Sequence, residues 1–258
     1  ATDSGVKLSK KGYSTVVSIA EEGTDLREEN RNVDVHVIDS ETRELSAEEA
    51  YEKLSGFINR VDIGKEDIIY KKVDSTLRGN IGAEIKALME NLNLSLCLFT
   101  PSFPENDREV VGGYLLVEET PLGNSEYYEG DLDPGEASYI PSLLENQCDV
   151  AIGKIELKDV MKNSQKLFET VNDLYQSGKK LIIFDSLNDK HLHNILDCSL
   201  NFSESILYSG SAGLANNLPH IFQANQRDHI IEQSPFFIVI GTRQKVMDAQ
   251  IEYLQKKM

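Results

Sequence analysis

Short apolar runs alternate with segments of helical periodicity along this chain, and this alternation constrains the fold more than any other feature. Strand-like runs occupy residues 14–19, 33–38, 67–72, 94–99, 150–155, 181–184, 206–208 and 236–240. Helical patterns stand between several of them, for example at 46–58, 81–90 and 160–177. Repeated strand–helix units favour an α/β fold in which helices cover both faces of a mostly parallel sheet. We therefore predict a three-layer α/β architecture.

A polar stretch at residues 223–235 is the best candidate for a domain boundary. We predict one α/β domain over residues 1–228 and the start of a second, truncated α/β domain over 229–258. A strand and a helix cannot build a core alone, so the alternative is that this last segment completes the preceding sheet. Residues 110–117 should form a hairpin or a strand–turn pair, and 118–141 should form a loop-rich connection.

The charge balance narrows the kinds of partner. The 258 residues carry a formal net charge of -17, so nucleic acid and anionic membranes would on average be repelled. No apolar run approaches the length of a membrane span. Cys97, Cys148 and Cys198 lie far apart and mostly within apolar runs, which is typical of reduced thiols in the cytoplasm. We expect a cytoplasmic protein with no nucleic-acid or membrane partner.

The polar segment 71–80, between a strand-like run and a helical pattern, is the strongest candidate for a site. Such a loop leaves the carboxyl end of a strand, where open α/β sheets bind ligands. Arg78 can hold a carboxylate through two parallel hydrogen bonds, Asp74 can accept a proton or orient a hydroxyl, and Gly79 lets the backbone approach a ligand. The alternative is a solvated loop in which Ser75 and Thr76 only cap the helix.

Three further strand-to-helix turns are weaker candidates. The segment 101–108 ends in Arg108 and leads to paired glycines at 112–113, which suit either a pocket wall or a proline-stiffened turn into a hairpin. The small residues at 209–215 could cradle phosphate on helix N–H groups or simply pack a helix tightly on the sheet. The turn at 241–244 is similar. None of these turns matches the P-loop or the dinucleotide fingerprint.

Taken in chain order, these motifs resemble the four-carbon acid sugar kinase family, which comprises the D-threonate, D-erythronate and oxo-tetronate kinases. The most specific part is the segment 71–80 with Gly82 and Glu84. The other matching positions are Asp39, Thr42, Arg43, residues 101–104, Arg108, Gly113, residues 121–122, Asp185, residues 209–215, residues 241–243 and Gln250. The resemblance therefore covers nearly the whole chain.

The resemblance implies an N-terminal domain that binds a sugar acid, a C-terminal domain that binds ATP, and phosphorylation of a sugar-acid hydroxyl between them. On this basis we assign Asp74 to orienting or deprotonating the hydroxyl and Lys72 to neutralising phosphate charge. Arg78 and Arg108 would bind the carboxylate or the phosphoryl group. The further substrate-binding assignments are Arg43, Ser75, Asn80, Arg108 and Gly113. The nucleotide-binding assignments are Thr242, Gln244, Ser211 and Gly213. Mg²⁺ is expected with ATP, but no residue is assigned as its ligand.

Four departures from the family pattern bear on activity. The family opens with a strand and an Asp-Asp-x-Thr-Gly-Ala turn, and this sequence begins at the equivalent of the last alanine, Ala1. Asp107 replaces the usual glycine before the arginine, and Thr242 replaces a serine. The family's later glycine-rich ATP loops are missing from these 258 residues, which we therefore expect to hold an incomplete nucleotide domain.

Three hypotheses follow for the function. The first is an ATP-dependent sugar-acid kinase, for which a homodimer is compatible with the sequence. The second is a non-catalytic sugar-acid binding module that lacks a complete nucleotide domain. The third is a nucleotide-dependent enzyme such as a dehydrogenase, which the lack of a G-x-G-x-x-G turn after the first visible strand disfavours.

Overall fold

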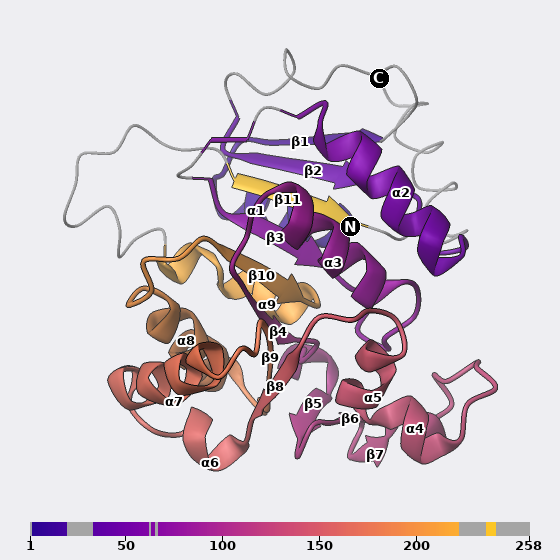
Figure 1. Ribbon diagram of the computed structural model, residues 1–258, viewed down its shortest axis with the longest axis vertical. Coiled ribbons are helices and arrows are strands. Elements are labelled where there is room, and N and C mark those ends of the chain that lie inside the picture. The colour runs from indigo at the N-terminus through magenta and orange to yellow at the C-terminus, as the bar shows by residue number, and fades with distance from the viewer. Residues whose placement is uncertain (1, 20–32, 62, 65–66, 222–235, 241–258) are drawn as a thin grey trace.

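The computed structural model describes residues 2–19, 33–61, 63–64, 67–221 and 236–240, and its centre is a large parallel sheet (Figure 1). The strands of this sheet are β1 (Thr15–Ile19), β2 (Val35–Asp39), β3 (Ile69–Lys72), β4 (Leu96–Thr100), β8 (Ile152–Ile155), β9 (Leu181–Phe184), β10 (Ile206–Gly210) and β11 (Phe236–Ile240). In the described part of the chain they follow the order β1-β2-β11-β3-β10-β4-β9-β8, and every neighbouring pair is parallel.

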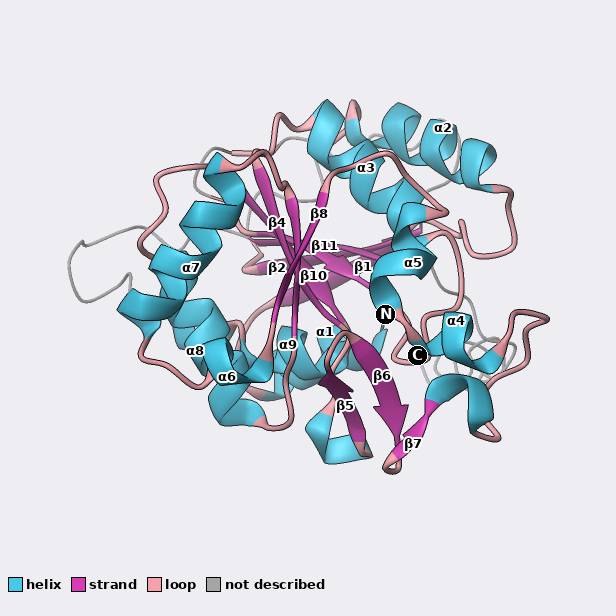
Figure 2. Ribbon diagram, turned by 60° about the horizontal axis from the view of Figure 1, so that its bottom comes forward, coloured by secondary structure: helices cyan, strands magenta, loops and turns pink. Residues whose placement is uncertain are grey.

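Helices cover both faces of the sheet, which gives three layers (Figure 2). On one face lie α2 (Ala47–Ile58), α3 (Ile81–Asn91) and α5 (Ile140–Glu145), whose buried residues share one core. On the other face lie α1 (Thr2–Lys10), α6 (Leu157–Val160), α7 (Ser164–Gln176), α8 (Asp189–Ser199) and α9 (Ala212–Asn217), which share a second core. The predicted α/β fold with a mostly parallel sheet between helices is therefore confirmed.

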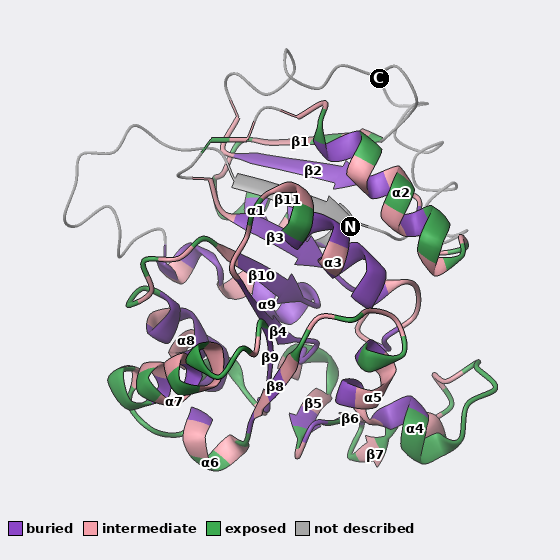
Figure 3. Ribbon diagram, viewed as in Figure 1, coloured by how far each residue is buried: buried purple, intermediate pink, exposed green. Residues whose placement is uncertain are grey.

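Successive strand residues alternate between the two cores. In β4, Leu96 and Leu98 contribute to the core under α7 and α8, whereas Cys97 and Phe99 contribute to the core under α2 and α3. Side chains of a strand point to opposite faces in turn, and a parallel sheet covered on both sides needs apolar residues on both. This accounts for the continuous apolar runs in the sequence and for the buried strands in Figure 3.

A small antiparallel sheet projects beyond the carboxyl end of β4 (Figure 2). It consists of β5 (Arg108–Val111), β6 (Tyr114–Val117) and β7 (Thr120–Pro121), so the predicted hairpin at 110–117 is confirmed. The short helix η1 (Pro104–Asn106) precedes this sheet, and η2 (Leu122–Asn124) and α4 (Pro134–Ser138) follow it. The expectation of a loop-rich connection over 118–141 was wrong in part, because a strand, a 3₁₀ helix and an α-helix form there.

The C-terminal strand β11 pairs on one side with β2 and on the other with β3. Residues 241–258 and the whole polar stretch at 223–235 lie outside the described residues, so the domain boundary at 228 stays a prediction. The strand itself belongs to the main sheet, as the alternative to that boundary expected. None of the helices in the described ranges combines the length and apolarity that crossing a membrane requires.

Because all strands of the main sheet run in the same direction, their carboxyl ends meet at one edge. The loops after β2, β3, β4, β8, β9 and β10 all leave this edge. The candidate site residues that the structure describes lie on these loops or on the elements next to them, except Gly113, which lies in the turn between β5 and β6. The fold therefore places the site at the carboxyl edge, where α/β sheets of this kind bind ligands.

Candidate anion-binding site at the carboxyl edge of the sheet

The loop between β3 and α3 turns tightly directly after the strand. The backbone N–H of Val73 donates to the carbonyl of Gly210 at 2.8 Å, which ties the start of the loop to β10. Leu77 and Gly79 both adopt positive φ angles, of 59° and 95°. This region is accessible to glycine and unfavourable for a branched residue such as leucine. The tight path brings the polar side chains of the loop together around Asp74.

Asp74 is the centre of a compact ionic cluster, which we call the Asp74 cluster and which comprises Asp74, Thr76, Arg78 and Arg43. Arg78 donates from Nε to Oδ2 at 2.7 Å and from Nη2 to Oδ1 at 3.3 Å. The Thr76 hydroxyl donates to Oδ2 at 2.5 Å. Arg43, from the loop after β2, brings Nη2 to 3.5 Å from Oδ1. Both oxygens of one carboxylate are thus engaged by two cations and a hydroxyl.

These contacts determine the charge state of Asp74. Burial by itself would raise its pKa, but the hydrogen bonds from Arg78 and Thr76 and the charges of both arginines lower it from 3.8 to about 2. Asp74 is therefore ionised at neutral pH and is a weak proton acceptor. The hydrogen bond to Asp74 in turn raises the pKa of Arg78.

Arg43 is nearly enclosed, with only 10% of its side chain exposed. Its Nε and Nη2 are buried without a hydrogen-bond partner among the described residues. Burial lowers the pKa of Arg43, the charge of Asp74 opposes this shift, and the charge of Arg78 adds to it. Buried donors without acceptors are costly in a protein, and an anion is the ligand that would supply the acceptors.

Arg78 is the more accessible arginine of the cluster. Its side chain is 38% exposed and lines a cavity of about 430 Å³ between the β3–α3 loop and the α4–α5 region. The other residues that line this cavity are Thr76, Leu77, Gly79, Leu122, Tyr128, Glu129, Gly130, Leu132, Ala137, Leu143, Asn146 and Gln147. A volume of this size suits a small organic ligand. Among the described residues, Arg78 is the one arginine or lysine that lines this cavity, and Nη1 is its one guanidinium nitrogen that does not donate to Asp74.

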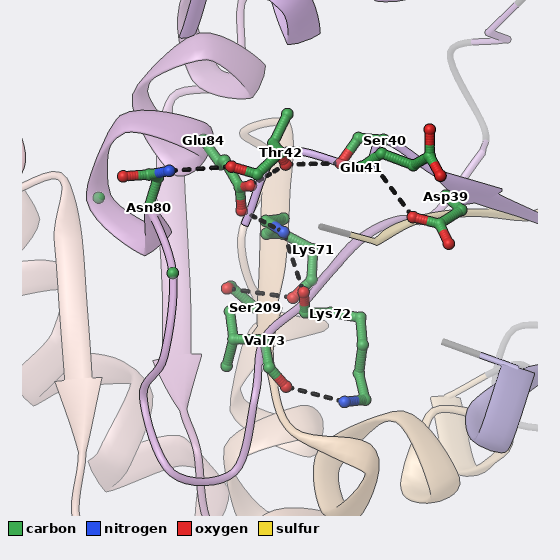
Figure 4. Close-up of polar contacts among 12 residues, drawn as sticks. Asp39, Ser40, Glu41, Thr42, Lys71, Lys72, Val73, Asn80, Glu84 and Ser209 are labelled. Carbon is green, nitrogen blue, oxygen red and sulfur yellow. Dashed lines mark hydrogen bonds and ion pairs between the residues drawn. The ribbon is translucent and has the colours of Figure 1, made fainter. Parts of the chain in front are cut away.

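Three further residues predicted for the site lie on the same loop or beside it. Lys72 is 9% exposed and donates from Nζ to the carbonyl of Val73 at 2.8 Å (Figure 4). Asn80 donates from Nδ2 to the carbonyls of Thr42 at 2.9 Å and Leu45 at 2.7 Å. Asn80 thereby holds the loop that carries Arg43. Ser75 is half-buried in the loop itself.

The structure does not join Arg108 and Gly113 to the Asp74 cluster. Arg108 places its guanidinium 4.5 Å from the centre of the Tyr127 ring and donates to the carbonyl of Asn106. The N–H of Gly113 donates to Asp185 Oδ1 at 2.8 Å, and that of Gly112 donates to Oδ2 at 2.8 Å. Asp185 therefore ties the hairpin tip to the end of β9. The roles of Arg108 and Gly113 in substrate binding stay predictions.

The turn between β10 and α9 is packed against the loop after β4. The Ser211 hydroxyl donates to the carbonyl of Ser102 at 2.7 Å and accepts from the N–H of Gly213 at 3.0 Å. A Cβ on Gly213 would collide with the backbone of Ser102 and Phe103. These contacts match the tight-packing alternative for this turn, and nucleotide binding by Ser211 and Gly213 stays a prediction. Thr242 and Gln244 lie outside the described residues.

The described residues do not provide a cage for Mg²⁺. No group of three or more His, Cys, Asp or Glu side chains among them could hold a metal ion. At the carboxyl edge, Asp74 is occupied by arginines, and Asp185 accepts three backbone N–H groups, including that of Leu157 at 3.0 Å. Mg²⁺ in phosphoryl-transfer sites takes one or two carboxylates together with the phosphates, and neither Asp74 nor Asp185 has an oxygen left without a hydrogen bond for it.

Sequence reasoning gave no role to one buried carboxylate beside the site. Glu84 is 2% exposed in the first turn of α3, where it forms an ion pair with Lys71 from β3 (Figure 4). The signal in the sequence was a glutamate between Ala83 and Ile85, in a helix whose neighbouring positions are small or apolar. A carboxylate at such a position requires a buried cation, because an unpaired buried charge is too costly.

A family model described as a sugar-binding N-terminal domain matches residues 1–218. Three curated relatives are similar over most of the chain. A D-erythronate kinase from Heliobacterium modesticaldum is 31% identical, covering 76% of this chain and 44% of the relative. A D-threonate kinase from Salmonella typhimurium is 28% identical, covering 98% of this chain and 57% of the relative. A 3-oxo-tetronate kinase from Pseudomonas fluorescens is 30% identical, covering 86% and 52%.

Solved structures share the fold. A Haemophilus influenzae protein of the DUF1537 family superposes with a TM-score of 0.73 at 19% identity, covering 98% of this chain and 75% of that one. A Bordetella bronchiseptica protein, described as a domain-swapped dimer with bound citrate, superposes with a TM-score of 0.69 at 22% identity, covering 99% and 62%. The chain spans about half the length of the curated relatives it matches.

Proposed function

Since the chain belongs to the four-carbon acid sugar kinase family through its sugar-binding N-terminal domain, we propose that it binds the sugar acid that the whole protein phosphorylates with ATP. The relatives are named as kinases of D-erythronate, D-threonate and 3-oxo-tetronate. Each of these compounds is a small carboxylate with hydroxyl groups. The proposal therefore requires a site for one carboxylate beside a position from which a hydroxyl can be phosphorylated.

The observation that carries the proposal is an excess of positive charge in the Asp74 cluster. Arg43 and Arg78 bring two positive charges to a single carboxylate, in a chain of net charge -17. Glu44 and Glu129 also act on Arg78, without a hydrogen bond to it. A substrate carboxylate would bind the arginines directly. It would accept from Nη1 of Arg78 and from Nε and Nη2 of Arg43, which have no hydrogen-bond partner among the described residues.

The charge state of Asp74 supports a role in which it positions neighbouring side chains and does not remove the proton of the substrate hydroxyl. A carboxylate with a pKa of about 2 whose two oxygens are already engaged has little affinity for a hydroxyl proton at neutral pH. We assign it to holding Arg43 and Arg78 in place. Phosphoryl transfer depends mainly on positioning and charge neutralisation, so the reaction does not require a strong base here.

ATP, Mg²⁺ and the roles of Thr242 and Gln244 belong to the part of the proposal that concerns the whole protein. Lys72 at the end of β3 is the cation of this domain that we assign to the transferred phosphate. A homodimer stays a prediction for this chain. The swapped dimer is a description of the Bordetella protein, whose 22% identity supports a shared fold alone.

An assay of ADP release tests the proposed reaction. The complete gene product, supplied with ATP and Mg²⁺, should consume ATP with D-erythronate, D-threonate or 3-oxo-tetronate. Arg78→Gln should lower kcat/KM about 100-fold, since a hydrogen-bonded charge is lost. Arg60→Gln is the matched control, because Arg60 lies beyond the end of α2, with its guanidinium 5.8 Å from the centre of the Phe57 ring. No turnover with any of these acids would contradict the kinase, and binding without turnover would indicate a non-catalytic binding module.

A further inference from the structure

A fully buried ion pair lies directly behind the Asp74 cluster. Lys71 Nζ is 2.5 Å from Glu84 Oε2, and the two side chains are 1% and 3% exposed. Removing two charges from water costs several kcal/mol per ion, and their attraction often fails to return it. Such a pair is therefore weak evidence for stability alone, and its further contacts are the place to look for a role.

The other oxygen of Glu84 reaches the loop after β2. It accepts from the hydroxyl of Thr42, which is itself 2.8 Å from the hydroxyl of Ser40 (Figure 4). A threonine hydroxyl has a single proton to donate. Since Thr42 gives this proton to Glu84, Ser40 must be the donor to Thr42. The chain Ser40–Thr42–Glu84–Lys71, which we call the Thr42 network, thus has a defined direction.

The Thr42 network also forms hydrogen bonds with the backbone at the end of β3. Lys71 Nζ donates to the carbonyl of Lys72 at 3.0 Å, and the hydroxyl of Ser209 donates to the carbonyl of Lys71 at 3.2 Å. Asn80 holds the carbonyl of Thr42 from the other side at 2.9 Å. The loop after β2 is therefore attached to both β3 and α3 through Thr42.

Arg43 is the next residue after Thr42, and its polar contacts alone hold it loosely. The ion-pair contact of its guanidinium, with Asp74, spans 3.5 Å, and two of its nitrogens have no hydrogen-bond partner among the described residues. Its position therefore depends also on how firmly the backbone of the neighbouring Thr42 is held. Two members of the Thr42 network, Thr42 and Lys71, each directly precede a predicted site cation, Arg43 and Lys72 respectively.

We propose that Thr42 is a positioning residue, anchored by the buried Lys71–Glu84 pair, that holds Arg43 against Asp74 ready for the sugar-acid carboxylate. This inference rests on the proposed function. A network built only for stability would predict that its loss lowers the melting temperature and leaves the affinity of the folded protein unchanged. A positioning network predicts a loss of affinity in protein that is still folded.

Calorimetric titration of the 258-residue chain with D-erythronate and with D-threonate, well below the melting temperature, tests the inference. Thr42→Val should weaken binding about tenfold, as expected for one lost hydrogen bond that places a charged ligand contact. Thr42→Ser keeps the hydroxyl and should bind within about twofold of the unmodified chain. Thr170→Val is the matched control, since the Thr170 hydroxyl donates to the carbonyl of Lys166 within α7 and to no other residue that the structure describes.

Arg43→Gln separates this inference from the proposed function. If Arg43→Gln weakens binding and folded Thr42→Val binds normally, the positioning role is wrong and the site stands. If the unmodified chain binds neither acid, or if Arg43→Gln binds as tightly as the unmodified chain, no carboxylate binds at Arg43. The positioning role and the proposed site are then both wrong. Should Thr42→Val fail to fold, Ser40→Ala removes the donor at the outer end of the Thr42 network. Normal affinity in folded Ser40→Ala would then overturn the inference.

Discussion

At the scale of single residues, Asp74 is the side chain around which the site is organised. Its side chain is 14% exposed, and its carboxylate binds Arg43 from the loop after β2 and Arg78 from the loop after β3. Arg78 is four residues away in sequence, and Arg43 is brought in by the fold. The same contacts that organise the arginines stabilise the ionised carboxylate, so this residue links the site to the pH dependence of folding.

We expect Asp74 to contribute to stability only while it is ionised. Its pKa falls from 3.8 to about 2 on folding, so its contribution is complete above the unfolded value and is lost as the pH falls through the folded value. The shift corresponds to about 2 kcal/mol. The unfolding free energy from urea denaturation should therefore fall more steeply between pH 5 and pH 2 in the native chain than in Asp74→Asn. Equal slopes in the two proteins would show that the Asp74 cluster does not hold the ionised form.

At the scale of elements, the strands and long helices could be predicted because their periodicity is local. The capping box Ser46–Glu49 that begins α2 is a further local signal, and both of its hydrogen bonds are present. The short helix α4 was missed because Pro134 and Gly135 lie within a polar stretch that is typical of loops. Its position depends on packing, as the burial of Ala137 shows.

The candidate site could be predicted only where its residues lie within one loop. Asp74 and Arg78 are four residues apart, and the structure brings them together as a binding loop requires. Arg43 was assigned only through the family resemblance, since no spacing relates it to Asp74. Gly113 shows the converse: its N–H binds Asp185, which is 72 residues away and could not be identified as its partner from the sequence.

The turn that starts α9 provides a test at this scale. A Cβ at Gly213 would collide with the backbone of Ser102 and Phe103, and backbone can move little in a packed interior. Gly213→Ala should therefore lower the melting temperature by several degrees without any ligand, an effect of about 1–3 kcal/mol. Gly56→Ala is the control, because Gly56 is a helix residue with open space around it and should be stabilising. An unchanged melting temperature in Gly213→Ala would exclude the packing role.

At the scale of the whole molecule, a strongly acidic chain keeps a small cationic site at one edge of its sheet. The net charge of -17 would repel an anionic substrate over long distances, whereas within a Debye length the local arginines dominate. Affinity for a sugar acid should therefore depend on the Asp74 cluster and not on the overall charge.

Calorimetric titration of D-erythronate, D-threonate and 3-oxo-tetronate into the unmodified chain, Arg78→Gln and Arg60→Gln, without nucleotide, tests this central claim most directly. At least one acid should bind the unmodified chain and Arg60→Gln with equal affinity, and Arg78→Gln should bind it at least about thirtyfold more weakly. Equal affinity in Arg78→Gln and the unmodified chain would show that the carboxylate is held elsewhere and would contradict the account.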